Sequence, residues 1–128
     1  MGNPSKAKGT RAETKVVRYL EEHGFVARRQ ALAGSNDPGD IEAYAPDSTE
    51  KIVIEVKAGK QTTAPSRKQI EEWCRQALVE ACNSESETAI LIVVRYHRAL
   101  EDADVYMPFN NTNSRVHWYL DDWVNHFK

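Results

Sequence analysis

The sequence predicts an α/β (α+β) domain in which helices flank a mixed central β-sheet. Apolar residues recur at helical spacing in two segments, from about Thr10 to His23 and from Pro65 or Ser66 to Cys82. Short runs rich in β-branched residues lie between and after them, bounded by Gly, Pro, Asn and Ser, as is typical of strands and turns. The predicted order is αβββαβ, followed by a C-terminal extension.

The first helix is expected to begin at Thr10, which forms a capping-box pattern with Glu13, and to end at Gly24. Residues 1–8 are expected to be disordered. Strands are expected at residues 25–30, 40–45, 51–57 and 88–95, with two more at 104–109 and 115–120 and a short helix at 121–127. The turn at residues 46–50 predicts a hairpin between the second and third strands, and the apolar fourth strand is expected at the centre of the sheet.

The length of 128 residues fits one domain, residues 1–128, with residues 97–128 as an extension of the core. We find no run of 18 apolar residues, so no membrane partner is expected. The polar, basic N-terminus lacks the apolar stretch of a secretory signal. The protein is therefore expected in the cytoplasm, or in the host cytoplasm if the chain comes from a phage.

Basic residues gather at the start of the chain, although the net charge is −2. Residues 1–30 contain seven Lys and Arg against three acids, whereas residues 77–128 contain four basic and eight acidic residues. Such a concentration of positive charge can bind DNA phosphates even on a net-acidic protein. A solvated helix face is the alternative reading. The candidate DNA contacts are Lys6, Lys8, Arg11, Arg28, Arg29 and Lys60.

The predicted third strand, Ile52–Lys57, is strongly apolar yet ends in Glu55 and Lys57. Strand side chains alternate, so Val53, Glu55 and Lys57 share one face, with about 6.6 Å between the last two. At that spacing both can reach one phosphate, the acid through a metal ion and the ammonium group directly. The alternative, a surface alternation of charges, is weakened because Val53 lies on the same face.

Asp40 begins the preceding strand, directly after Pro38 and Gly39. Counting from both ends of the hairpin places Asp40 nearly opposite Glu55. Two adjacent carboxylates repel each other unless a cation lies between them, and hard oxygen ligands select Mg²⁺ or Mn²⁺. The alternative is a turn aspartate that bonds its own backbone.

Glu13 lies at the centre of the apolar stripe of the first helix, flanked by Val16, Val17 and Leu20. A carboxylate buried there is costly unless it is paired or bound to metal. A capping role is the alternative, and the two roles are compatible.

These residues together resemble the PD-(D/E)xK nuclease superfamily, here as Gly39-Asp40 and Glu55-Val56-Lys57. The chain is most similar to the archaeal-type Holliday junction resolvases, through Lys8 to Glu13 at the start of the first helix and the Gly24-Phe25 pair. The resemblance covers about residues 8–82 and implies a restriction-endonuclease-like core. The Pro-Gly-Asp turn and the long C-terminus depart from the family pattern.

The resemblance implies that Asp40 and Glu55 bind Mg²⁺, with Mn²⁺ as a substitute and the backbone carbonyl of Val56 as a third ligand. Lys57 would activate the attacking water or stabilise the developing charge. Glu13 would complete the site, through a second metal ion or its water. Gln69 corresponds to a glutamine in the second helix of many superfamily members, although a capping role with Ser66 fits equally well.

The implied function is that of a metal-dependent endodeoxyribonuclease, a Holliday junction resolvase that cuts four-way or otherwise branched DNA and leaves 5′-phosphates. A resolvase cuts two symmetric strands, so a homodimer is expected. The alternatives are a restriction-like, nicking or flap nuclease on the same fold, and a non-catalytic DNA-binding protein.

Overall fold

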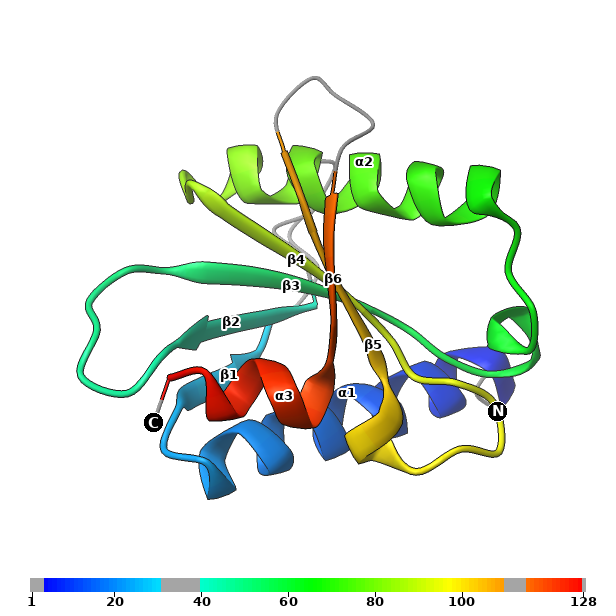
Figure 1. Ribbon diagram of the computed structural model, residues 1–128, viewed down its shortest axis with the longest axis horizontal. Helices are drawn as coiled ribbons and strands as arrows, with labels where there is room; N and C mark the ends of the chain where they lie inside the picture. Colours follow the sequence, from blue (N-terminus) through cyan, green and yellow to red (C-terminus); the bar gives the residue numbers. More distant parts are fainter. Residues whose placement is uncertain (1–3, 31–39, 110–114, 128) are drawn as a thin grey trace.

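The computed structural model describes residues 4–30, 40–109 and 115–127, with side chains from residue 11 onward. All six strands form one sheet in the order β1-β2-β3-β4-β5-β6. Helix α2 covers one face of the sheet, and α1 and α3 cover the other (Figure 1). The predicted mixed sheet with flanking helices is confirmed.

The sheet is mixed because one neighbouring pair of strands is parallel. Strands β3 and β4 run parallel, and the other four neighbouring pairs are antiparallel. The predicted hairpin of β2 and β3 and the central position of β4 are confirmed. The strands are β1 (Val26–Arg29), β2 (Ile41–Tyr44), β3 (Ile52–Lys57), β4 (Thr88–Val93), β5 (Asp104–Pro108) and β6 (Arg115–Tyr119).

Helix α1 (Pro4–Glu22) begins six positions earlier than the sequence predicts. Residues 4–8 are helical, so the prediction that residues 1–8 are disordered is wrong for that part. Proline is compatible with the first turn of a helix, which explains how Pro4 can start it. Thr10 is consequently an interior helix residue, and the predicted capping box with Glu13 is wrong.

The end of α1 agrees with the prediction. Gly24 has a φ of 89°, which glycine adopts without steric cost. The N–H of Phe25 donates to the carbonyl of Leu20 (3.0 Å), and that of Gly24 donates to the carbonyl of Glu21 (3.1 Å). These bonds form a Schellman motif, which turns the chain toward β1.

Helix α2 (Arg67–Asn83) begins with an N-cap at Ser66, whose side chain accepts a 3.1 Å hydrogen bond from the N–H of Gln69. The predicted capping role of Ser66 is therefore confirmed. The buried face of α2 contains Ile70, Trp73, Cys74, Ala77, Glu80 and Ala81.

Alternation along β3 divides its side chains between the two layers of the core. Ile52, Ile54 and Val56 join the cluster beneath α1 and α3, and Val53 packs against α2. Glu55 and Lys57 follow Val53 on the side of the sheet that α2 covers. Two charged groups at the end of an otherwise apolar strand therefore lie at the edge of the α2 layer.

The C-terminal part of the chain completes the sheet and the core. Helix α3 (Leu120–Asn125) buries Leu120, Trp123 and Val124 beside α1 (Figure 1). Two 3₁₀ turns, η1 (Lys60–Thr62) and η2 (Leu100–Asp102), precede α2 and β5. None of the helices described is long and apolar enough to cross a membrane. The predicted loop at Ala31 to Gly39 and the turn at Asn110 to Asn113 lie outside the described residues.

Candidate active site

Glu55 and Lys57 lie together at the carboxyl end of β3. The Lys57 ammonium group is 3.3 Å from Oε1 of Glu55, and the two side chains are 19% and 5% exposed, respectively. An ion pair this well shielded from solvent is stronger than one on the surface. The alternative of a surface charge alternation is therefore wrong for this pair.

Asp40 lies directly opposite Glu55, because Ile41 pairs with Ile54 in the antiparallel register. The Asp40 N–H donates to the Ile54 carbonyl (3.1 Å), and Oδ2 of Asp40 accepts a 2.8 Å hydrogen bond from the N–H of Val56. The latter bond crosses to β3, so it is not the local turn bond considered above. The register predicted from the hairpin is confirmed.

Glu13 approaches Asp40 from α1. Its Oε2 accepts a 3.0 Å hydrogen bond from Nε of Arg29, and its side chain is 17% exposed. Burial raises the pKa of Glu13, and the neighbouring Asp40 carboxylate raises it further, while Arg29 acts in the opposite direction. Helix α1 thus brings a third carboxyl group next to Asp40.

Carboxyl groups outnumber positively charged groups around Glu55 and Asp40. Burial raises the pKa of Glu55 to about 10, with further contributions from the carboxyl groups of Glu80 and Asp40. Among the described residues, Lys57 and Arg29 form ion pairs with Glu55 and Glu13. Carboxyl groups this close cannot all be ionised unless a cation lies between them, and without one some of them keep their protons.

The donor set fits a hard divalent cation. Oε2 of Glu55 is buried and accepts no hydrogen bond from a described donor. The described residues include no cluster of three or more His, Cys, Asp or Glu side chains that could hold a metal ion. Mg²⁺ is usually held by one or two carboxylates and keeps several waters, so Asp40, Glu55 and the Val56 carbonyl are a suitable set.

Two further polar residues, Gln76 and Glu80 of α2, reach Glu55 and were not predicted. Nε2 of Gln76 lies 3.4 Å from Oε1 of Glu55 and 2.9 Å from Oε1 of Glu80. Both residues follow Trp73 at helical spacing, three and seven positions further along the chain, which puts them on the apolar face of α2. Polar residues on that face are the signal that could have identified them.

The predicted glutamine, Gln69, has a different environment. Its backbone takes part in the N-cap of α2, and among the described residues no hydrogen bond joins its side chain to Asp40, Glu55 or Lys57. In this structure the glutamine that contacts Glu55 is Gln76, two turns further along α2.

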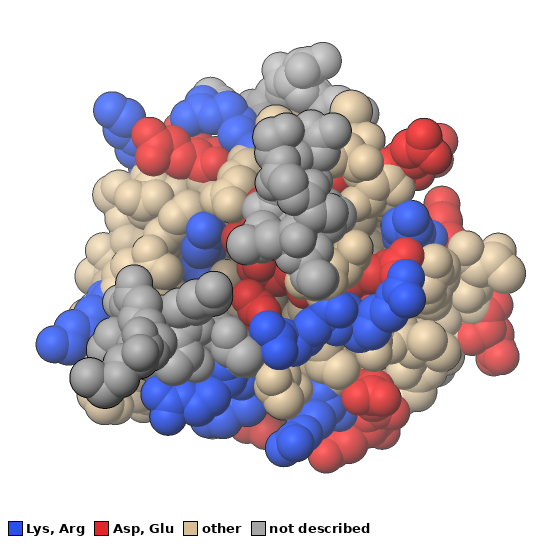
Figure 2. All heavy atoms as spheres, turned by 180° about the vertical axis from the view of Figure 1, so that it is seen from behind, with Lys and Arg blue, Asp and Glu red and all other residues tan. Residues whose placement is uncertain are grey.

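The candidate DNA contacts are divided among several environments. Arg28 pairs with Glu42 at 2.5 Å, and Arg29 pairs with Glu13. Arg11 and Lys60 are exposed, on α1 and η1. The side chains of Lys6 and Lys8 lie outside the described atoms. Figure 2 shows Lys and Arg side chains in a band across the lower half of one face, next to acidic side chains.

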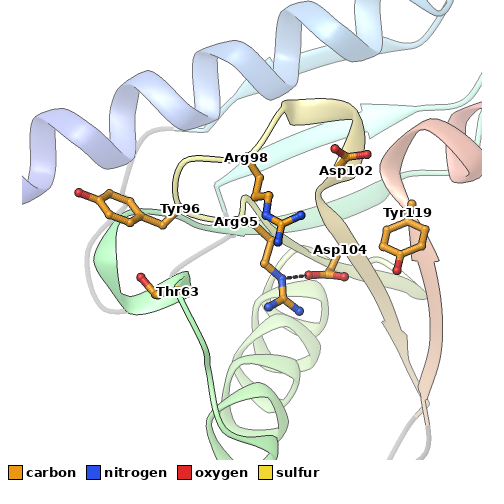
Figure 3. A pocket seen from close by; sticks show the side chains of 7 residues that line it. All are labelled: Thr63, Arg95, Tyr96, Arg98, Asp102, Asp104 and Tyr119. Atoms are coloured by element: carbon orange, nitrogen blue, oxygen red, sulfur yellow. Dashed lines mark hydrogen bonds and ion pairs between the residues drawn. The ribbon is translucent and has the colours of Figure 1, made fainter.

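Additional basic residues line two pockets beyond the end of β3. The N–H of Val94 donates to the Lys57 carbonyl (2.8 Å), which joins the segment after β4 to the candidate site. Arg95 and Arg98 extend from that segment into a cavity of about 400 Å³ (Figure 3). Buried Asp104 accepts a hydrogen bond from Arg95 and lies 2.7 Å from Nε2 of His117.

The second pocket, of about 340 Å³, lies between α1 and the same segment. Arg11, Lys15, Arg95 and Arg98 line it, and its described lining includes no acidic residue. Gly59, two residues after Lys57, also lines it. A cationic pocket therefore adjoins the end of β3.

Comparison with known proteins gives a family and a fold. The sequence model of the archaeal Holliday junction resolvase (Hjc) family matches residues 4–119, which include all six strands. No curated protein matches the chain. One similar solved structure is Hjc, a Holliday junction resolvase from the archaeal hyperthermophile Archaeoglobus fulgidus, with 24% identity, a TM-score of 0.51, and coverage of 88% of this chain and 89% of that chain.

The structural likeness, at that identity, shows a shared fold, and the match to the family model extends over β5 and β6 as well as the nuclease core. The protein therefore belongs to the archaeal Holliday junction resolvase family, which consists of metal-dependent endodeoxyribonucleases that cut branched DNA in a structure-selective way.

Proposed function

We propose that this chain resolves four-way DNA junctions by Mg²⁺-dependent hydrolysis of phosphodiester bonds at Asp40, Glu55 and Lys57. The observation that carries the proposal is the hairpin register, which puts Asp40 opposite Glu55 while Lys57 lies 3.3 Å from the Glu55 carboxylate. Two carboxylates and an ammonium group at one strand end suit a metal ion and a scissile phosphate together.

In this proposal Asp40 and Glu55 hold the cation, with the Val56 carbonyl as a third ligand. A bound divalent cation would lower the pKa of a water molecule and neutralise charge on the scissile phosphate. Mg²⁺ is the expected ion because the ligands are hard oxygens, and Mn²⁺ should substitute for it. Glu13, beside Asp40, would contact a second ion or its water.

Lys57 would act directly on the phosphate. Its ammonium group is shielded from solvent and held by Glu55, so it need not be reordered when charge develops. It would orient the attacking water or stabilise the negative charge of the transition state. The products should carry 5′-phosphates. Gln69 has no proposed chemical role beyond the N-cap of α2.

We assign DNA backbone contacts to the exposed basic residues around the site. Arg11 and Lys60, with Lys6 and Lys8, would contact phosphates, and Arg98 joins them because it lines both pockets. Arg28 and Arg29 would contact DNA while remaining paired with Glu42 and Glu13. Two symmetric cuts require two sites, so the working form is a homodimer with one nuclease domain per chain.

The test compares four-way, flap and linear duplex DNA, each incubated with Mg²⁺, with Mn²⁺ and with EDTA. We expect paired, symmetric cuts in the four-way junction alone, with either metal and not with EDTA. Glu55→Gln should abolish cutting and retain junction binding, whereas Glu72→Gln, at an exposed position of α2, should cut normally. Equal cutting of linear duplex would contradict junction selectivity, and no cutting of any substrate would favour a non-catalytic DNA-binding protein.

A further inference from the structure

Two polar side chains of α2, Gln76 and Glu80, lie over the strand that carries Glu55. Glu80 is 2% exposed and Gln76 is half-buried. They lie one helical turn apart on the face that also buries Trp73 and Ala77. Burying a carboxyl group under a helix is unfavourable unless it has a polar partner, so this pair calls for an explanation beyond packing.

The amide of Gln76 bridges the carboxyl groups of Glu55 and Glu80, which also interact with each other directly. Nε2 donates to Oε1 of Glu80 at 2.9 Å and to Oε1 of Glu55 at 3.4 Å. Only the nitrogen of an amide carries hydrogens, and it carries two, so one can serve each acceptor. When both carboxyl groups are ionised, as a bound cation would favour, the reversed amide would put its oxygen against two carboxylate oxygens, and this repulsion fixes the side-chain orientation.

The bridge acts on one particular oxygen of Glu55. Lys57 also contacts Oε1, at 3.3 Å, so two donors hold that atom. Oε2 is buried and accepts a hydrogen bond from no described donor group. With Oε1 held by Gln76 and Lys57, the carboxylate has a defined orientation, and Oε2 remains for a cation.

We infer that Gln76 is a positioning residue for the Glu55 carboxylate, and that Glu80 acts through Gln76 by accepting its second amide hydrogen. Hydrogen-bond partners of metal-binding carboxylates commonly hold them in the geometry that the ion requires. The inference rests on the proposed role of Glu55 as a metal ligand. It extends that role by assigning the orientation of the Glu55 carboxylate to two residues of α2.

The first test replaces Gln76 with methionine, which has a similar length and lacks the amide donors. Mn²⁺ binding to the protein without DNA is measured by titration calorimetry, and junction cutting is measured in single-turnover reactions. We expect Gln76→Met to weaken Mn²⁺ binding about 10- to 100-fold, with a comparable loss of cutting rate at subsaturating metal. Wild-type Mn²⁺ affinity in this variant would overturn the inference.

The second test separates an acceptor from a charge at position 80. Glu80→Gln keeps an oxygen that can accept from Gln76, whereas Glu80→Met removes it. We expect Glu80→Gln to stay within about twofold of wild type and Glu80→Met to match Gln76→Met. If Glu80→Gln lost as much Mn²⁺ affinity as Glu80→Met, Glu80 would act through its charge, and its proposed role would be wrong.

Combining the substitutions shows whether Glu80 acts through Gln76. If it does, Glu80→Met should cause no further loss of Mn²⁺ affinity in the Gln76→Met background, since residues that act as a unit are not additive. If the two losses of Mn²⁺ affinity multiplied, Glu80 would act on Glu55 independently of Gln76, which would contradict the inference. Glu72→Met, at an exposed position of the same helix, is the matched control and should leave Mn²⁺ affinity unchanged.

Thermal unfolding distinguishes positioning from a structural role. Methionine has a similar size and removes the cost of burying a carboxyl group, so Glu80→Met should unfold close to the wild-type temperature. Lower metal affinity that follows a lower unfolding temperature would indicate a structural role and overturn the inference. A wild-type protein that binds Mn²⁺ yet cuts no junction would refute the proposed function instead.

Discussion

The backbone N–H of Val56 donates a 2.8 Å hydrogen bond to Oδ2 of Asp40, and this bond ties the end of β3 to the residue that precedes β2. The Asp40 N–H makes a second bond across the same pair of strands, to the Ile54 carbonyl at 3.1 Å. The two bonds fall on either side of Glu55. Asp40 is thus held beside Glu55 by backbone geometry and by its own carboxylate.

This arrangement predicts how Asp40→Asn should behave. An asparagine oxygen can still accept from the Val56 N–H, so the unfolding temperature should stay close to that of wild type. The negative charge is lost, so single-turnover cutting of a four-way junction should fall at least about 100-fold. Junction binding, measured by gel shift in EDTA, should change little. Near-wild-type cutting would remove Asp40 from the site.

The raised pKa of Glu55 predicts how stability depends on pH without metal. Its value is about 10 in the folded protein, against 4.5 for an ordinary glutamate. A carboxyl group of raised pKa contributes stability that is complete below the ordinary value and is lost as pH rises toward 10. In EDTA, the free energy of unfolding from urea titrations should therefore be lower at pH 9 than at pH 6.

Two comparisons check that this pH dependence belongs to Glu55. Glu55→Gln has no titrating group at this position, so its unfolding free energy should fall less between pH 6 and pH 9. Mg²⁺ should also reduce the fall in wild type, because a bound cation favours the ionised carboxylate. Glu72→Gln, at an exposed position, should retain the wild-type slope. An unchanged slope in Glu55→Gln would assign the effect to other groups.

The fold and the central part of the candidate site were predictable because they depend on local pattern. The β2–β3 turn is short, so counting residues on either side of it was enough to place Asp40 opposite Glu55. Helical periodicity likewise put Glu13 on the buried face of α1. In both cases the position of the residue depends on a feature close to it in the sequence, the β2–β3 turn for Asp40 and Glu55 and the helical period of α1 for Glu13.

Features that depend on distant partners could not be predicted in the same way. Gln76 meets Glu55 only because α2 packs over β3, and this contact joins residues 21 positions apart. Asp104 is buried between Arg95 and His117, which belong to its two neighbouring strand regions. The early start of α1 has a local reason, since proline is common in disordered termini and is also compatible with the first turn of a helix, where Pro4 lies.

The burial of Trp123 indicates that α3 unfolds together with the rest of the domain. The Trp123 side chain is 2% exposed, and its ring lies 5.5 Å from Phe25 and 5.4 Å from Phe127. Trp123→Ala should lower the free energy of unfolding by about 3–5 kcal/mol, as is usual for a large core aromatic. Trp123→Phe should cost less, because the buried indole N–H has no described acceptor. Urea unfolding would measure both, and equal losses would contradict this view.

Arg98 offers the clearest separation of DNA binding from chemistry. It is exposed, lines both pockets beyond Lys57, and forms no described ion pair, unlike Arg95, which is engaged by Asp104. If Arg98 contacts one phosphate, Arg98→Gln should reduce the slope of log binding constant against log salt concentration by about 1. Arg98→Lys keeps the charge and should keep the slope.

The cutting rate gives a second readout for Arg98. Because the phosphate that Arg98 contacts is not the scissile one, Arg98→Gln should still cut bound junction at the wild-type rate when enzyme is in excess. A reduced rate with an unchanged salt slope would place Arg98 in the chemistry of the site and not in DNA binding.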